Sequence, residues 1–317
     1  MAITKHIERF GGLPVVDFPG AAEDGRDLPD AAAAAWKVGL DYESEQTFAE
    51  AWERFLGAVD TARVTAVVIG NWSSEEPEPL DGPLRAVVDA AGRLPALRAL
   101  FVGDVTFEEC EISWLQMCDV TPLFEAFPRL EELVVRGASP DWENNGGLAL
   151  TPLRHEHLRT LRFEAGGLPG SVVRAVGACD LPALESLELW LGVENYGGTW
   201  GPDDLAPFLS GTRLPALRRL GLQNSEQQDA IAALVAQAPV VARLEHLALS
   251  MGALTDEGAT ALLEGQPLTH LSSLDLHHHY LTDAVQQRLT EALPGVDVDL
   301  SDAQKWDDNW RYVAVSE

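Results

Sequence analysis

Basic residues are scarce in this 317-residue sequence. Lysine and arginine together number 22, of which only three are lysines, against 50 aspartates and glutamates, and the formal net charge is −28. A surface this acidic repels phosphate backbones and anionic headgroups, and no run of basic residues offers a local exception. The sequence therefore predicts neither a nucleic acid nor a membrane as a partner.

Cysteines and long apolar runs are also lacking. The three cysteines, an odd number without the spacing of a disulfide framework, favour a reducing compartment. No apolar stretch approaches the roughly 18 residues of a membrane span. The first residues do not combine a basic with an apolar region, as a secretory signal does. We expect a soluble protein of the cytoplasm.

Catalytic signatures are missing as well. The chain contains no phosphate-binding loop and none of the G-x-S-x-G, H-E-x-x-H or paired C-x-x-C motifs. Cys110 is flanked by carboxylates, which raise the pKa of a thiol and so disfavour a nucleophilic thiolate. We therefore expect a protein that is not an enzyme and that binds no cofactor.

What the sequence does contain is a repeated apolar pattern, L-x-x-L-x-Φ, in which Φ is apolar. Successive copies begin 33, 28, 26, 33, 27 and 27 residues apart. The second leucine and Φ alternate with other positions, as in a strand with one buried face, and such strands stack into a parallel sheet with a continuous core. The seven copies are Leu97/Leu100/Val102, Leu130/Leu133/Val135, Leu158/Leu161/Phe163, Leu184/Leu187/Leu189, Leu217/Leu220/Leu222, Leu244/Leu247/Leu249 and Leu271/Leu274/Leu276.

The segments that link these strands have helical patterns. Ile231, Leu234 and Val235 follow a three-to-four-residue period, and Thr255 and Thr282 stand where they can cap a following helix. On these features the chain resembles the ribonuclease-inhibitor-like class of leucine-rich repeats, although it lacks the asparagine or cysteine that many members carry after the strand. The resemblance implies an α/β leucine-rich-repeat solenoid, with a curved parallel sheet on the concave side and helices on the convex side.

We divide the chain into three parts. Residues 1–60 are predicted to form an N-terminal cap with a degenerate first repeat around Trp36. Residues 61–300 are predicted to form the solenoid, and residues 301–317 an acidic, mobile C-terminal tail. Atypical ends are expected because an uncapped solenoid would expose its apolar terminus.

Residues that alternate with the leucines are expected on the concave face, the surface that such proteins use for binding. The middle of this face concentrates charge and one aromatic side chain, at Arg136, Arg162, Glu164, Glu188 and Trp190. Arginine next to tryptophan is typical of interface hot spots, so these residues are candidates for partner binding. The alternative is a set of charge pairs across adjacent strands with the tryptophan covering them.

A second group of candidate partner-binding residues falls just after the strands, where loops begin. Trp72, Trp142, Tyr196 and Trp200 lie there among glycines and asparagines, and the two 33-residue units are longer partly by insertion in this region. Exposed aromatic residues on a loop rim make an adaptable contact surface. The alternative is that each tryptophan folds back over its own loop.

A short histidine run suggests a metal site as a further hypothesis. Asp275, His277 and His279 alternate along one predicted strand, so they share a side on which zinc or iron could bind. His279, however, occupies a turn position that usually points inward. The alternative is a polar, partly solvated strand end.

Taken together, the repeats and the segments Glu109–Trp114 and Leu276–Tyr280 resemble an uncharacterised actinobacterial leucine-rich-repeat family. The genes of that family neighbour radical-SAM, ATP-grasp and phosphatase-like genes, so the resemblance implies an accessory protein of a bacterial modification pathway. We thus expect a non-catalytic scaffold that binds a protein or peptide. The alternatives are a metal-binding accessory or metal-dependent enzyme and a structural assembly subunit. The sequence predicts no oligomeric state.

Overall fold

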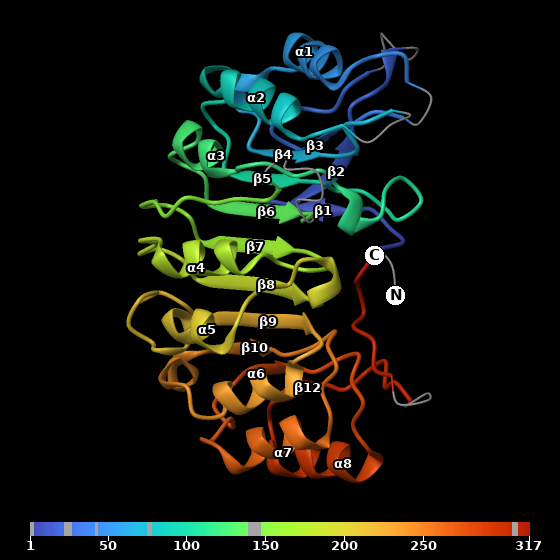
Figure 1. Ribbon diagram of the computed structural model, residues 1–317. Coiled ribbons are helices and arrows are strands. Elements are labelled where there is room, and N and C mark those ends of the chain that lie inside the picture. The colour runs from blue at the N-terminus through green and yellow to red at the C-terminus, as the bar shows by residue number, and fades with distance from the viewer. Residues whose placement is uncertain (1–2, 22–26, 42–43, 75–77, 139–146, 306–309) are drawn as a thin grey trace.

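The chain forms an α/β fold around one large sheet (Figure 1). The computed structural model describes residues 3–21, 27–41, 44–74, 78–138, 147–305 and 310–317. Within these ranges twelve strands lie in the sheet in chain order, and only the first pair is antiparallel. The strands are β1 (Arg9–Phe10), β2 (Leu13–Asp17), β3 (Ala35–Val38), β4 (Ala66–Ile69), β5 (Ala99–Val102), β6 (Glu132–Arg136), β7 (Thr160–Glu164), β8 (Ser186–Gly192), β9 (Arg219–Ser225), β10 (His246–Ala248), β11 (Ser273–Asp275) and β12 (Asp297–Asp299).

Helical segments connect the strands. Every described connection from β3 to β12 contains an α-helix, a 3-10 helix or both, except for the one between β6 and β7. The α-helices are α1 (Phe48–Ala58), α2 (Asp81–Asp89), α3 (Thr121–Ala126), α4 (Gly170–Ala178), α5 (Pro202–Leu209), α6 (Gln228–Val235), α7 (Asp256–Glu264) and α8 (Asp283–Ala292). The 3-10 helices are η2 (Thr61–Arg63), η3 (Ala91–Arg93), η4 (Ile112–Trp114), η5 (Glu194–Tyr196) and η6 (Pro239–Arg243).

The leucine pattern sets the register of the sheet. The second leucine of each copy pairs with that of the next, from Leu100 on β5 to Leu274 on β11. The same row continues to Trp36 and Val67 at one end and Val298 at the other. A one-residue slip would turn every leucine out of the core, so this alignment follows from the burial of one face. The degenerate repeat predicted around Trp36 contains a strand, β3, and strands β4 and β12 lie around Val67 and Val298.

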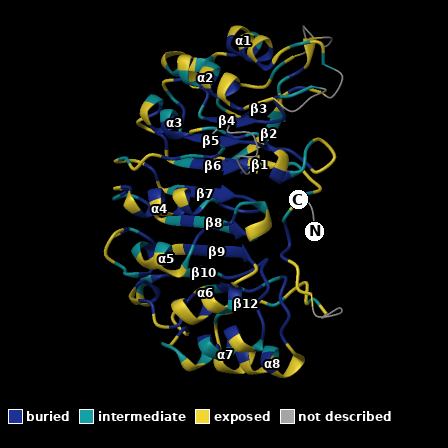
Figure 2. Cartoon of the chain, viewed as in Figure 1, coloured by how far each residue is buried: buried dark blue, intermediate teal, exposed yellow. Residues whose placement is uncertain are grey.

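The main core lies between this leucine row and the helices. It includes the buried sides of all eight described α-helices, so the helices cover one face of the sheet. Figure 2 shows the strands as a buried layer against helices whose outer sides are exposed. The largest fully buried side chains of this core include Trp36, Trp52 and Phe55 near the N-terminal end. We call the opposite side of the sheet the helix-free face.

Side-chain clamps join successive helices on the covered face. Thr255 is the N-cap of α7, as predicted, and accepts a hydrogen bond from the backbone N–H of Glu257. Asp229, in the first turn of α6, accepts from the N–H and hydroxyl of Thr255, both at 2.7 Å. Asp256 accepts from Thr282 in the same way, both at 2.8 Å. The threonine before each of these helices therefore holds it to the preceding unit, but the capping hydrogen bond expected from the Thr282 side chain is not formed.

Both terminal segments return to the middle of the molecule. Ile3 packs in one small apolar cluster with Ala314 and Val315, so the described parts of the two terminal segments meet beside the ends of the strands (Figure 1). The expectation of a free, mobile tail is wrong for residues 310–317, because Val313, Ala314 and Val315 are buried. Among the described helices, none has the length and apolar character needed to cross a bilayer.

Candidate functional site

The residues that stand between the second leucine and Φ of each repeat were predicted to share one face. They lie in register on the helix-free face. Cross-strand pairing joins Val68, Phe101, Val134, Arg162, Glu188, Gly221, Ala248 and Asp275 in that order. A second row on this face is formed by the residues that directly follow Φ in each repeat. The pairs Arg136–Glu164 and Trp190–Gln223 belong to it. The sequence therefore predicted correctly which side chains share this face.

The N-terminal segment covers the first third of that face. Phe10 on β1 packs with Val68, Phe101 and Val134 in a second, smaller apolar core, and Phe10 and Phe101 meet edge to face at 5.6 Å between ring centroids. The strand residues here are apolar because they face another segment of the chain and not water. The strands from β7 onward are the part of this face that lies outside that apolar cluster.

A chain of ion pairs crosses the sheet at the edge of this covered region. Arg136 donates from Nε to Glu164 at 2.6 Å, and its Nη1 lies 3.3 Å from Asp104. The guanidinium also lies over the ring of Phe101, 4.9 Å from its centroid. Arg136 and Glu164 are only 5% and 2% exposed. These two predicted binding residues are therefore buried and support the surface from beneath.

Asp104 is the centre of this network, and sequence reasoning missed it. Its carboxylate is fully buried and lies 3.3 Å from both Lys37 and His6. Asp104 follows Gly103, which has a left-handed φ of +91°, and an added Cβ at Gly103 would lie 2.4 Å from the backbone oxygen of Arg136. The glycine turns the chain back at the strand end, and the leucine spacing carries no signal for that turn.

The ion-pair chain reaches the surface at two partly exposed residues. Arg162 donates from Nη1 to Glu164 on its own strand at 3.3 Å and forms an ion pair with Glu188 on β8, with 2.9 Å between Nε and the carboxylate. The Arg162 side chain is 34% exposed and that of Glu188 17%. Arg162 also borders a pocket of about 240 Å³ between β6 and the N-terminal hairpin. Burial raises the pKa of Glu132 in this pocket, and Arg162 opposes the shift.

Trp190 stands next to these charges and is half-buried. It packs against Ile112, Met251, Ala314 and Val315, so the C-terminal segment covers part of its indole. Of the five predicted residues on the face, the structure thus keeps Arg162, Glu188 and Trp190 accessible. We call these three the central patch.

Two of the four residues of the predicted aromatic rim are buried. Trp72 and Trp200 are buried in the main core, and the indole N–H of Trp72 donates to the backbone oxygen of Glu78 at 2.7 Å. The prediction that they offer an exposed surface is wrong, because each tryptophan folds back under its loop. Tyr196 is partly exposed and donates to the carboxylate of Glu317. Trp142 lies outside the described residues.

The histidine run is split between two roles. His277 contacts Asp275 at 2.7 Å, and ligand atoms of His277, Asp275 and Asp299 all lie within 4.8 Å of one another. His279 does not join this group. It is fully buried, its Nε2 lies 3.1 Å from the backbone oxygen of Leu300 and its Nδ1 accepts from a backbone N–H. The third candidate ligand is therefore Asp299, from the next strand, and not His279.

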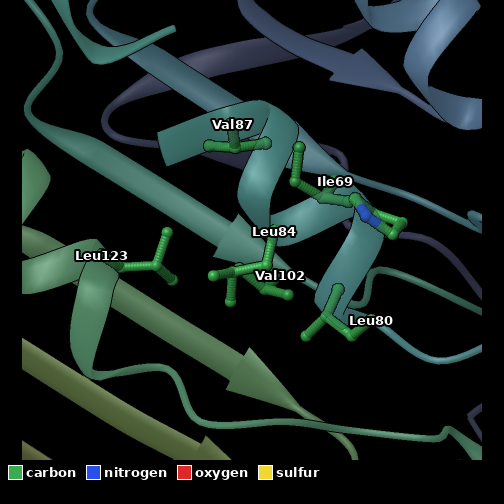
Figure 3. A pocket seen from close by; sticks show the side chains of 7 residues that line it. Ile69, Leu80, Leu84, Val87, Val102 and Leu123 are labelled. Atoms are coloured by element: carbon green, nitrogen blue, oxygen red, sulfur yellow. The ribbon is translucent and has the colours of Figure 1, made fainter. Parts of the chain in front are cut away.

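The interior beside α2 does not provide a ligand site. A void of about 10 Å³ lies between α2, β4, β5 and α3 (Figure 3). Its lining is entirely apolar, and its volume is near the lower limit for a single water molecule. The labelled side chains around it are Ile69, Leu80, Leu84, Val87, Val102 and Leu123.

Comparison with known proteins identifies a similar solved structure. No family model matches the chain, and no curated protein is similar to it. A crystal structure of a Bacteroides fragilis protein, solved as a structural-genomics target, superposes with a TM-score of 0.78 at 30% sequence identity. The match covers 86% of this chain and 76% of that one. At this identity and coverage, the chain belongs to the same family as the Bacteroides fragilis protein.

Proposed function

We propose that the chain is a leucine-rich-repeat solenoid that serves as a non-catalytic scaffold, binding a protein or peptide at the central patch of its concave face. The observation that carries the proposal is the ion-pair chain, in which buried Arg136 and Glu164 fix the partly exposed Arg162 and Glu188. The repeated units, paired in register with helices on one side, support the solenoid.

The central patch has the composition of an interface hot spot. A preorganised arginine loses little conformational entropy when it binds, and a neighbouring tryptophan adds apolar area. The net charge of −28 favours a partner with basic groups, because complementary charge speeds and orients encounter. A role in the cytoplasm as an accessory of a bacterial modification pathway is part of this proposal, and the family resemblance supports it.

The thiols are poorly suited to nucleophilic chemistry. Burial, followed by Glu111 and Glu109, raises the pKa of Cys110 to about 11. Burial, followed by Asp81 and Asp119, raises the pKa of Cys118 to about 12. Both thiols stay protonated at neutral pH, and the thiolate is the reactive form. This supports a binding role over covalent catalysis at these cysteines.

Combining Arg162→Glu with Trp190→Ala is expected to abolish partner capture while the protein stays folded. Removing hot-spot residues costs about 2 kcal/mol or more, which weakens binding about 30-fold or more. The native protein, the double variant and Arg174→Glu would be compared as affinity baits in lysate of the source cells. Arg174, on α4, is an exposed arginine paired with Asp204 and serves as the matched control. Equal capture by the double variant would remove the central patch from the account.

A metal-binding accessory is the second candidate function, and the approach of Asp275, His277 and Asp299 favours it. One imidazole and two carboxylates are a ligand set that suits zinc or iron. Competing contacts weigh against it, because Asp275 accepts from Ser250 at 2.9 Å and from the backbone N–H of His277 at 3.0 Å. Without a metal, Asp275 and His277 are the end of a row of hydrogen-bonded side chains that begins at Ser250.

If this group is a metal site, zinc titration of untagged protein should give one bound ion per chain. Asp299→Asn is expected to weaken that binding about tenfold or more, since even outer-shell changes at metal sites cost about 10–100-fold. Asp283→Asn, in the first turn of α8, is the control and should leave binding unchanged. Isothermal titration calorimetry with zinc chloride measures both. Absence of stoichiometric binding would eliminate this candidate.

A further inference from the structure

The backbone of residues 312–316 in the C-terminal segment makes several hydrogen bonds to the body of the protein. The N–H of Ala314 donates to the backbone oxygen of Met251 at 2.7 Å. The side chain of Asn224 accepts from the N–H of Val315 at 2.9 Å and donates to its carbonyl at 2.5 Å. Ser113 donates to the carbonyl of Ser316. Contacts of this kind recognise an extended peptide largely without regard to its side chains.

Tyr312 continues this pattern toward the other end of the segment. The hydroxyl of Tyr280 donates to its carbonyl at 3.0 Å and accepts from its N–H at 2.8 Å. Nε2 of His278 lies 3.1 Å from the same carbonyl. The side chain of Tyr312 points away and is 67% exposed. Asn224 and Tyr280 thus each grip both backbone polar groups of one residue in the segment.

The residues that hold the segment occupy a special backbone position. Asn224, Met251, His278 and Asp302 have φ between 55° and 67°. Asn224 is the penultimate residue of β9, and the other three each lie three residues after the end of β10, β11 or β12. They are the described non-glycine residues with positive φ. At the ends of β5, β6 and β8 the left-handed residue is a glycine: Gly103 and Gly137 directly follow β5 and β6, and Gly192 is the last residue of β8.

Non-glycine residues in the left-handed region store strain, and such strain gathers at functional sites. Three of the four, Asn224, Met251 and His278, contact the C-terminal segment directly. The fourth, Asp302, lies 3.1 Å from Nδ1 of His278 and so orients that ring. The chain therefore departs from glycine where the strand ends face the segment.

The body of the protein also leaves room for the segment. An added Cβ at Gly166 would lie 2.2 Å from the carbonyl oxygen of Ser316 and 2.4 Å from Oγ of Ser113. Gly166 itself has no left-handed φ. The absence of a side chain at Gly166 makes space for the bound backbone. The backbone conformation at this position does not itself require glycine.

We propose that these strand ends form a peptide-binding groove, with residues 310–317 as its resident occupant. The partner that fits this groove is an extended protein segment of the same chemistry, with three small apolar residues followed by a polar and an acidic one. It binds by displacing the resident segment. Val313, Ala314 and Val315 are all buried and define the apolar requirement. Displacement also uncovers Trp190. The groove lies at the strand ends, so the proposal goes beyond the one for the sheet face.

The test uses a fluorescein-labelled peptide with the sequence of residues 310–317, added to the full chain. Val313→Asp with Val315→Asp releases the resident segment, because two carboxylates cannot be buried there without partners. The peptide is expected to bind this released chain at least about tenfold more tightly than the unaltered chain, as measured by fluorescence anisotropy. A peptide carrying the same two substitutions should not bind. Equal affinity for the two chains, or for the two peptides, would overturn the proposal.

Two further variants tie binding to the named contacts. In the released chain, Asn224→Gly keeps the left-handed turn and removes the two hydrogen bonds that the Asn224 side chain makes to the peptide backbone. Peptide affinity should therefore fall about tenfold. Gly166→Ala in that chain should abolish binding by steric overlap. Gly57→Ala, which adds a methyl group to open space on α1, should have no effect. Unchanged binding in both Asn224→Gly and Gly166→Ala would refute the assignment.

A measurement independent of the aspartate variants covers the case in which they do not fold. Gly166→Ala alone, in the otherwise unaltered chain, should displace residues 310–317. Amide hydrogen exchange of that segment is then expected to rise while β8 and β9 keep their protection. Exchange of residues 310–317 that stays as slow as in Gly57→Ala would show that the groove does not hold them as proposed.

Discussion

Replacing Arg136 with methionine is expected to lower the free energy of unfolding by about 3–5 kcal/mol, because breaking a buried ion pair leaves a charge without compensation. Arg136 is the cation that Asp104 and Glu164 share, at 3.3 and 2.6 Å. Its Nη1 also donates to the backbone oxygen of Val105 at 3.2 Å. Methionine fills a similar volume and supplies none of these contacts.

The geometry of Arg136 makes lysine a poor substitute. A guanidinium presents donors in a planar fork, which reaches Asp104, Glu164 and Val105 at once and lies over the ring of Phe101. Arg136→Lys is therefore expected to recover less than half of the loss. Urea unfolding followed by circular dichroism measures all three proteins.

Arg159→Met is the matched control for Arg136→Met. Arg159 precedes β7 and pairs with Glu185 at 2.5 Å, but both side chains are more than half exposed. Exposed pairs contribute about 0–1 kcal/mol, so this variant should unfold nearly as the native protein does. Similar losses in Arg136→Met and Arg159→Met would contradict the view that a buried ionic network supports the central patch.

Leu220→Ala is expected to lower the free energy of unfolding by about 2–5 kcal/mol. Leu220 on β9 is fully buried and pairs with Leu187 on β8 and Leu247 on β10. The cost combines the lost burial of the side chain with the cavity left between three strands. Packing at this row is what sets the register, so the effect should be large.

Leu234→Ala provides the comparison for Leu220→Ala. Leu234 lies on α6 and is 36% exposed, so its truncation should cost well under half as much. Thermal and urea unfolding of the two variants give the two free energies. A loss below about 1 kcal/mol for Leu220→Ala would show that the leucine row does not carry the core.

The leucine spacing predicted the strands, their order and the two rows of the helix-free face, because the two-residue period and the burial of one face together determine register. The rim was predicted less well. The sequence places Trp72 and Trp200 just after strands, but whether an indole folds inward depends on how its loop closes. The core position of both side chains follows from contacts made with distant residues.

Two other features depended on long-range contacts. Asp299 meets Asp275 and His277 because β12 pairs with β11 in register, and the spacing of the histidine run within its own strand carries no signal for a ligand from the next strand. The docked C-terminal segment had a signal that could have been used, the apolar run Val313–Val315 inside an acidic tail. Such a run in a polar segment indicates burial against another part of the chain.

The most direct test of the central claim is the footprint of a captured partner. Amide hydrogen exchange of the complex is compared with that of the free protein, peptide by peptide along the chain. We predict slower exchange in β7 and β8 and in the segments that follow them, around Arg162, Glu188 and Trp190, with the helices α4–α7 unchanged. Protection confined to those helices would place the partner on the opposite face and contradict the account.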